Sequence, residues 1–381
     1  MRITAELIDA RRDQHLWGDS YNRDLRDTLE LQNEVAEAVS NRIGMVLADK
    51  SAMPLRTAAR KLDPQAYEAY LRGRYYWNHR TVEGLRKALE YFQEAIARDP
   101  DYAAAYSGVA DCYLLLEWSS GMPSEQAFAG ARAAGNKALA LDPTLADAHA
   151  TTGQILLTAD WNWGGAEAEF RRAIILNPNY SMAHHWYGLE LGQQGRVEEA
   201  KRELELAREL DPVPAINETN VAWAYYVGRE YGTSISMLRK VLQRDPDFWL
   251  AHWGLGSGYV QTGEYTQAIA ELEQAVTLSN RDAGTISSLG VAEARAGNLA
   301  EARKLLAELL RRWQREAVSG TDIAVLYAAL GERKEAFAWL EKAYTARAHD
   351  LLSLNAEPWW DTLRNDRRFR ELTGKVGLAD R

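Results

Sequence analysis

The sequence is poor in cysteine, proline and long apolar runs. Cys112 is the only cysteine among 381 residues, so no internal disulfide can form, which fits a reducing compartment. No run of about 18 apolar residues occurs, so we expect no membrane span. The first residues, MRITAELIDARRD, lack the apolar stretch of a signal peptide, and we therefore expect a cytoplasmic location. The ten prolines are few, and frequent Ala, Leu, Glu and Arg favour helices.

Basic residues are fewer than acidic residues, with 45 Lys and Arg against 54 Asp and Glu. The formal net charge is −9 and the isoelectric point is near 5.5. An acidic chain repels phosphate backbones, so we expect no nucleic-acid binding by this chain. Hydrophobic residues make up 46% of the sequence, which is enough for a sizeable core.

What the sequence does contain is an internal repeat of 34 residues. Four columns of residues recur at this spacing, and we searched for such a period first because it determines the fold. One column is glycine, two are small or aliphatic, and one is proline: Gly195, Gly263, Gly297 and Gly331; Ala200, Ser234, Ala268, Ala302 and Ala336; Ala207, Val241, Ala275, Leu309 and Ala343; Pro178, Pro212 and Pro246. Gly228 and Pro143 miss the spacing by one residue.

Each repeat is predicted to form a helix, a turn and a second helix. In residues 181–212 the first helix ends near Gly195, and the second carries apolar residues every three or four positions. Asp211 and Pro212 end it, because a proline donates no backbone hydrogen bond and restrains the residue before it. The small residues are expected where two helices approach closely.

These columns resemble the tetratricopeptide repeat (TPR) family. The best matches are HWGLGSGYVQTGEYTQAIAELEQA at 252–275, HHWYGLELGQQGRVEEAKRELELA at 184–207 and AYSGVADCYLLL at 105–116. The resemblance implies an all-α fold, a right-handed superhelix (α-solenoid) of about eight helix-turn-helix units over residues 64–347. Two units carry insertions, near RTVEG and around EWSSGMPSEQ. Residues 348–381 are predicted to cap the array.

Several stretches imitate chemical motifs. His149, His184 and His252 share one repeat position, so they are interpreted as packing residues and not metal ligands. GARAAGNK at 130–137 has Asn136 where a phosphate loop needs lysine. Cys112 lies among apolar residues and is interpreted as a packed side chain. No catalytic, cofactor-binding or metal-binding residue is assigned, and we expect no enzyme activity and no cofactor.

The first 50 residues do not follow the repeat. RITAELIDA alternates in hydropathy and is predicted to form a strand, with QHLWGDSYNR as a second strand paired to it in a hairpin, followed by a helix over 28–47. This segment resembles the end of a TolB-N-terminal/FlgO-like α/β domain, which precedes TPR arrays in bacterial regulators. Residues 1–50 would thus be a partial α/β segment that offers an open sheet edge for self-association, and residues 51–63 a linker.

The resemblance leads to two hypotheses about function. The first is a non-enzymatic scaffold that binds a protein or peptide, and that forms the C-terminal part of a bacterial signalling or regulatory protein. The alternative is the effector-sensing module of a winged-helix transcriptional regulator or a nucleotide cyclase. In the TPR family the first helices line a concave groove, and its positions here would be His185, Trp186, Glu190, Trp223, Tyr226, Trp253 and Ser257. Aromatic residues stand where some TPR proteins use lysine, arginine and asparagine, so we expect no binding of a carboxylate terminus.

Overall fold

A computed structural model describes residues 2–9, 14–22 and 62–378, apart from 120, 121, 314 and 317. Strands β1 (Arg2–Asp9) and β2 (Gln14–Asn22) form an antiparallel pair that sets Leu7 opposite Trp17. This is the pairing that the alternating hydropathy predicted. The predicted helix over 28–47 and the linker 51–63 lie outside the described residues.

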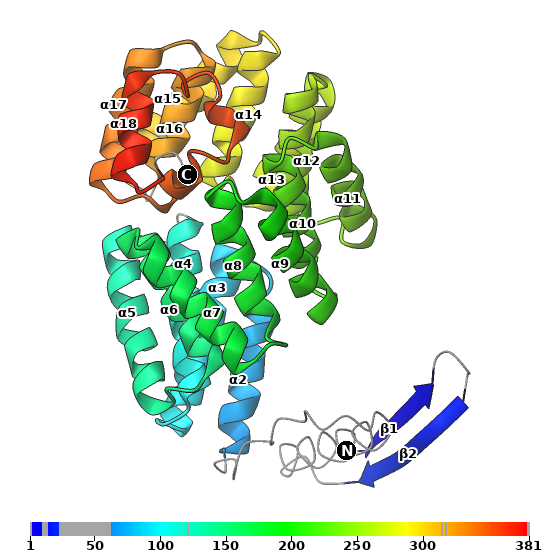
Figure 1. Ribbon diagram of the computed structural model, residues 1–381. Coiled ribbons are helices and arrows are strands. Elements are labelled where there is room, and N and C mark those ends of the chain that lie inside the picture. The colour runs from blue at the N-terminus through cyan, green and yellow to red at the C-terminus, as the bar shows by residue number, and fades with distance from the viewer. Residues whose placement is uncertain are drawn as a thin grey trace.

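The rest of the described chain is helical, and its helices follow one another in pairs (Figure 1). Between residues 62 and 378 the structure describes no strand. Eight pairs are formed in this range: α2 (Pro64–Trp77) and α3 (Val82–Arg98); α4 (Ala103–Trp118) and α5 (Ser124–Leu141); α6 (Ala146–Asp160) and α7 (Trp163–Leu176); α8 (Ser181–Gln193) and α9 (Val197–Leu210); α10 (Ala215–Val227) and α11 (Tyr231–Arg244); α12 (Trp249–Thr262) and α13 (Tyr265–Leu278); α14 (Ala283–Arg295) and α15 (Leu299–Arg312); α16 (Gly320–Ala329) and α17 (Arg333–Thr345).

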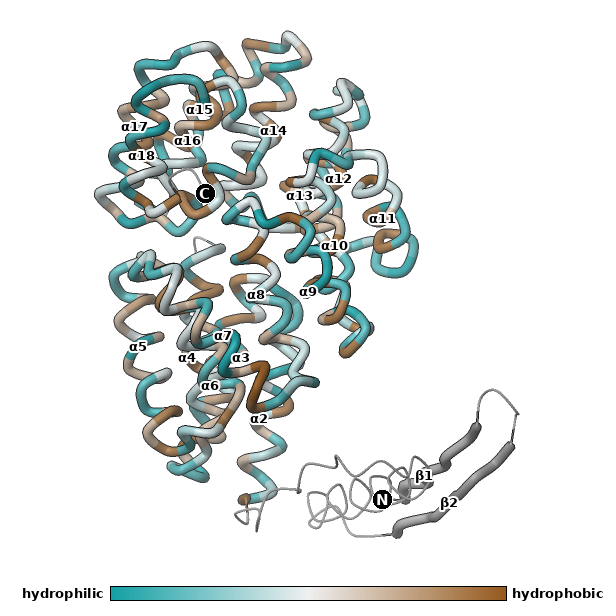
Figure 2. The backbone as a smooth tube through the Cα atoms, in the orientation of Figure 1, coloured by the Kyte–Doolittle hydropathy of each residue, from teal (hydrophilic) through white to brown (hydrophobic). Residues whose placement is uncertain are grey.

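The predicted period of 34 residues is confirmed in the helix starts. The first helices of four successive units begin at Ser181, Ala215, Trp249 and Ala283. The second helices of five units begin at Val197, Tyr231, Tyr265, Leu299 and Arg333. Helix α16 begins at Gly320, three residues late, because the break around residues 313–319 interrupts the period there. Hydropathy changes every few residues along the chain (Figure 2), as amphipathic packing requires.

The turn between the two helices of a unit has a left-handed residue at a fixed position. Gly195 has φ 78° and Gly263 has φ 83°, a conformation that glycine adopts without a steric penalty. Two other units use the same conformation without glycine, at Trp161 with φ 55° and Arg229 with φ 65°. Both lie on the 34-residue spacing. The left-handed conformation therefore recurs at this position in more units than glycine does.

The small columns lie where helices meet. Ala200, Ser234, Ala268, Ala302 and Ala336 are all fully buried. A Cβ atom on Gly256 would lie 2.6 Å from Leu272 Cγ and 3.0 Å from the Ala268 carbonyl oxygen. Glycine thus allows α12 to approach α13 as closely as it does.

The array curves so that its end meets its beginning. One core cluster joins Trp77, Leu157 and Leu191 of the early units to Leu340 and Leu352 near the C-terminus. The indole Nε1 of Trp249 donates to the carbonyl of Arg80 at 3.3 Å, across 169 residues of sequence. Figure 1 shows the red C-terminal helix beside α17, and the carbonyl of Val376 that follows it accepts a hydrogen bond of 2.9 Å from Trp163 Nε1 of an early unit. The concave side of the array is therefore closed by the chain itself.

The C-terminal segment consists of η2 (His349–Ser353), η3 (Pro358–Trp360) and α18 (Arg367–Lys375). Within this segment Leu363, Phe369 and Leu372 are buried. Arg367 and Arg370 are exposed, so the basic stretch 363–372 presents a solvated face. Within the part of the chain that the structure describes, no helix is long and apolar enough to cross a membrane.

Candidate binding cavity

A cavity of about 850 Å³ lies on the inner side of the array. First helices line it, through residues such as Leu157 of α6, Leu189 of α8 and Ile216 of α10. This volume falls in the range of small-ligand sites, which bury most of a ligand in a mainly apolar pocket with few polar groups. The first helices thus form the inner wall of the array, as the TPR resemblance implied.

Six of the seven predicted groove residues line this cavity. They are His185, Trp186, Trp223, Tyr226, Trp253 and Ser257. Trp223 and Trp253 are partly exposed, whereas the other four are buried. The structure therefore brings these six side chains together around one space. Whether they bind a partner is left to the proposal below.

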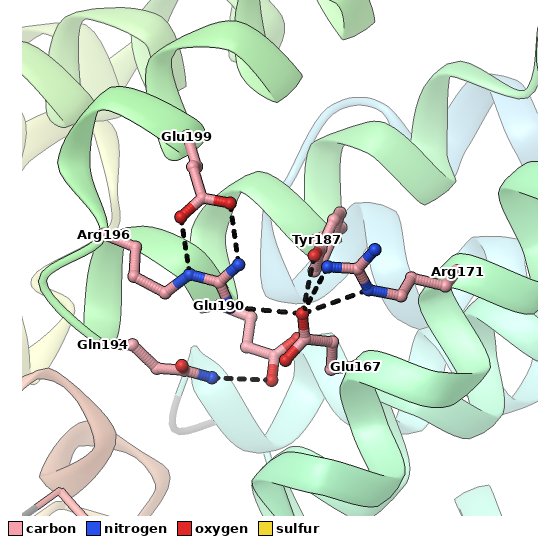
Figure 3. Close-up of polar contacts among 7 residues, drawn as sticks. All are labelled: Glu167, Arg171, Tyr187, Glu190, Gln194, Arg196 and Glu199. Carbon is pink, nitrogen blue, oxygen red and sulfur yellow. Dashed lines mark hydrogen bonds and ion pairs between the residues drawn. The ribbon is translucent and has the colours of Figure 1, made fainter. Parts of the chain in front are cut away.

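Glu190, the seventh predicted groove residue, does not line the cavity. Its side chain is fully buried, is not part of the cavity wall, and accepts a hydrogen bond of 2.9 Å from Gln194 in the turn that follows. Figure 3 shows it near Glu167. The carboxylate of Glu167 accepts from Tyr187 and Arg196. Glu190 therefore lies beside a cluster of polar contacts between units.

The indole groups of the cavity are held by hydrogen bonds to the protein. Trp253 Nε1 donates to Ser288 Oγ at 2.8 Å, and Trp223 Nε1 donates to Glu357 Oε1 at 2.9 Å. These bonds fix the rings across neighbouring elements. A ring whose N–H is already satisfied offers mainly its apolar surface to a ligand.

Both insertions in the repeat contribute to the cavity wall. Arg80 opens the first insertion, and Glu117, Trp118 and Ser124 belong to the second. His349 of the C-terminal segment also lines the cavity. Its Nδ1 lies 2.7 Å from Glu117 Oε2, and this contact connects the C-terminal segment to the second insertion. No role was predicted for these residues from the sequence. Their signal was the departure from the 34-residue period.

Acidic side chains of the cavity are engaged by protein groups. Asp282 caps α14 by accepting from the N–H groups of Gly284 and Thr285, and burial raises its pKa to about 6. Burial also raises the pKa of Glu357 to about 7. Asp350 pairs with His349 at 2.8 Å. Burial disfavours the His349 imidazolium, but Asp350 and Glu117 outweigh it and raise its pKa well above the ordinary value.

The stretches that imitate chemical motifs in the sequence have structural positions in the fold. Cys112 is fully buried, and burial raises its thiol pKa well above the usual value, so it is no nucleophile. Among the described residues no group of three or more His, Cys, Asp or Glu could hold a metal ion. The stretch 130–137 lies inside α5 and forms no phosphate loop.

Family comparison agrees with this architecture. Two family models described as tetratricopeptide repeat match the chain, one over residues 70–146 and 221–283 and the other over 283–318 and 317–349. These matches together cover more than half of the sequence. They do not reach residues 1–50, so the TolB-N-terminal/FlgO-like resemblance has no support from them.

Curated relatives share part of this array. The transcriptional regulator HilA of Salmonella typhimurium is 27% identical over 157 residues, which is 41% of this chain and 28% of HilA. A Rhizobium meliloti protein named "Putative adenylate cyclase 3" is 27% identical over 126 residues, which is 32% of this chain and 21% of that protein. The matched stretches thus span less than a third of either relative.

A solved structure shows the same kind of fold. The human IFIT1 dimer with PPP-AAAA aligns with a TM-score of 0.50 at 16% identity, over 82% of this chain and 78% of that one. At this identity the likeness concerns the fold alone. The repeat period, the eight helix pairs and the family models lead to one conclusion: this chain belongs to the tetratricopeptide repeat family and is a TPR scaffold of the kind used for protein interactions.

Proposed function

We propose that this chain is the partner-binding part of a bacterial signalling or regulatory protein, and that it takes an apolar peptide segment of its partner into the cavity. The observation that carries this proposal is the set of tryptophans around one space: Trp186, Trp223, Trp249 and Trp253 all line it. Large rigid aromatic side chains supply contact area at a small cost in conformational entropy, and they dominate binding energies at interfaces.

The names of the relatives support the regulatory context. HilA is named as a transcriptional regulator, and the Rhizobium meliloti protein as an adenylate cyclase. In this proposal residues 64–347 form the binding array, 348–381 close it, 51–63 link it to the front, and 1–50 form a partial α/β segment of TolB-N-terminal/FlgO type. That segment would promote self-association through its open sheet edge. The module would act in the cytoplasm and without a catalytic role.

A second candidate is the effector-sensing module, and the enclosure of the cavity favours it. The C-terminal segment contributes His349, Leu352 and Trp359 to the wall, so the space is bounded by the chain on several sides. An enclosed site of this volume fits a small molecule better than a long extended peptide.

Peptide selection on the full chain tests the leading proposal. A random dodecapeptide library is selected on the wild type, and the affinity of each selected peptide is measured by titration. Trp253→Ala should weaken binding at least tenfold with little change in thermal stability, because the Trp253 ring is partly exposed. Trp161→Ala is the matched control, since Trp161 is also partly exposed but does not line the cavity.

The result against the proposal is equally specific. Equal weakening by both substitutions, or no weakening by either, would show that peptides bind elsewhere. If Trp253→Ala unfolds the chain, Trp253→Phe keeps an aromatic ring while losing the bond to Ser288 and separates packing from binding.

A further inference from the structure

Arg80 is a buried cation at the cavity wall, and two of its side-chain donors are unpaired. It is 5% exposed, and its Nε and Nη2 atoms donate to no acceptor among the described residues. The guanidinium carbon lies 3.5 Å from the centre of the Trp77 ring, which supports the group without satisfying its N–H donors. A buried charge of this kind is costly unless something pairs with it.

The nearby carboxylate is already used by another residue. Asp111 lies 3.5 Å from Arg74 and accepts a hydrogen bond of 2.8 Å from Thr151. Burial lowers the pKa of Arg80 to about 9, with Arg74 adding to that effect, so Arg80 remains a cation at neutral pH. Asp111 offsets part of its charge from a distance but accepts none of its hydrogen bonds.

The ring of His185 does not neutralise Arg80 either. Its Nδ1 lies 3.0 Å from Asn217 Oδ1, and its Nε2 lies 2.9 Å from Asn220 Nδ2. An acceptor at one nitrogen and a donor at the other fix a neutral imidazole. Burial, with Arg80 adding to it, lowers the pKa of His185 to about 3.

Other unsatisfied polar atoms surround the same space. Gln193, Thr219 and Ser234 line the cavity, and each has a buried side-chain oxygen without a hydrogen-bond partner. Such atoms are rare in folded proteins and require an explanation. Their concentration around one cavity indicates a binding site whose polar contacts come from a ligand.

We propose that Arg80 forms a carboxylate-binding subsite in this cavity, for a small organic acid with an apolar body. Nε and Nη2 are two adjacent donors of one planar guanidinium, which is the arrangement that binds both oxygens of a carboxylate. The ring centres of Trp118 and Trp249 lie 6.2 Å apart, and both rings line the cavity. Trp249 also donates a hydrogen bond to the Arg80 carbonyl, so the two rings would cover the apolar body of the bound acid. The acidic residues of the wall make a dianionic phosphate a poorer occupant. The inference rests on the second candidate function above, the effector-sensing module.

Matched probes test the charge requirement. Phenylacetate, indole-3-acetate and octanoate are each titrated into the full chain beside their carboxamides, with inorganic phosphate as a separate arm. We expect each acid to bind at least tenfold more tightly than its amide. Arg80→Gln should reduce this preference to within about twofold, while Arg72→Gln, at an exposed arginine of the preceding helix α2, should retain it.

A merely structural Arg80 would behave differently. In the ligand-free state Arg80→Gln should leave the melting temperature unchanged or raise it, because the substitution removes an unpaired buried charge. A lower melting temperature would indicate that the main role of Arg80 is to stack on Trp77, and it would overturn the proposal. If that variant does not fold, Arg80→Lys keeps the charge and loses the paired donors, and the preference should fall at least threefold.

The remaining outcomes are also decisive. Binding of no probe at millimolar concentration, equal binding of acid and amide, or tight binding of phosphate would each overturn the carboxylate subsite. A selected peptide that binds only with a free C-terminal carboxylate, while the small acids do not bind, would overturn the small-ligand proposal. Peptide capture that survives the loss of acid binding leaves the proposed function intact, so the two failures are distinguishable.

Discussion

His184 Nδ1 lies 2.6 Å from a carboxylate oxygen of Glu203, while its Nε2 lies 2.9 Å from the carbonyl oxygen of Pro178. Both partners are acceptors, so both ring nitrogens must donate and the ring is a cation. His252 repeats the arrangement with Glu271 and Pro246. His184 and His252 are therefore packing residues, and each ties the first helix of its unit to the second helix and to the preceding proline.

This pairing predicts a dependence of stability on pH. Burial lowers the pKa of His184, but Glu203 and the Pro178 carbonyl outweigh it and raise the pKa above the ordinary value. A raised histidine pKa stabilises the fold below about pH 6.5, the unfolded value, and this contribution is lost as pH rises through the folded pKa. His184→Gln should cost about 1–2 kcal/mol at pH 6 and less at pH 9. Urea unfolding at both pH values checks this, and a cost independent of pH would refute it.

At Glu357 a substitution is expected to stabilise the fold, in contrast to the substitution at His184. Burial raises its pKa to about 7, although Trp223 donates to it. The folded state thus holds a proton that the unfolded state releases near pH 4.3, and stability from this group falls as pH rises from there through about 7. Glu357→Gln should therefore raise the free energy of unfolding at pH 8 by about 1–3 kcal/mol and change little at pH 4. Thermal melts would contradict this if the variant were less stable at pH 8.

Two glycine substitutions test the helix packing. Gly256→Ala places a Cβ atom 2.6 Å from Leu272 Cγ, so we expect a loss of about 1–3 kcal/mol from overpacking. Gly232→Ala meets no atom within 4 Å and should stabilise α11 by about 0.5 kcal/mol. Denaturant unfolding of both variants gives the comparison. Equal stabilities would show that α12 and α13 are not in close contact at Gly256.

The sequence predicts the repeats well because their physical causes are local and recur. Small residues at helix contacts and turn residues at a fixed spacing identify each unit. The position that requires a left-handed residue is filled by Trp161 and Arg229 in two units, so a glycine search misses it there.

The site was predicted only in part. The TPR resemblance places Trp223 and Trp253 on the inner face, but it cannot show that the array curves until Trp249 reaches Arg80. That contact depends on small rotations accumulated over several units. The insertions that carry Arg80 and Glu117 break the 34-residue period, so no role was predicted for them.

The location of the bound partner is the central claim, and fluorine NMR of the tryptophans measures it most directly. The full chain is labelled with 5-fluorotryptophan, its thirteen signals are assigned by Trp→Phe variants, and a selected peptide or small acid is titrated in. We predict that the signals of Trp118, Trp249 and Trp253 shift, while Trp161 and Trp339, outside the cavity, stay unchanged. Saturable binding that moves only Trp161 or Trp339 would contradict the account.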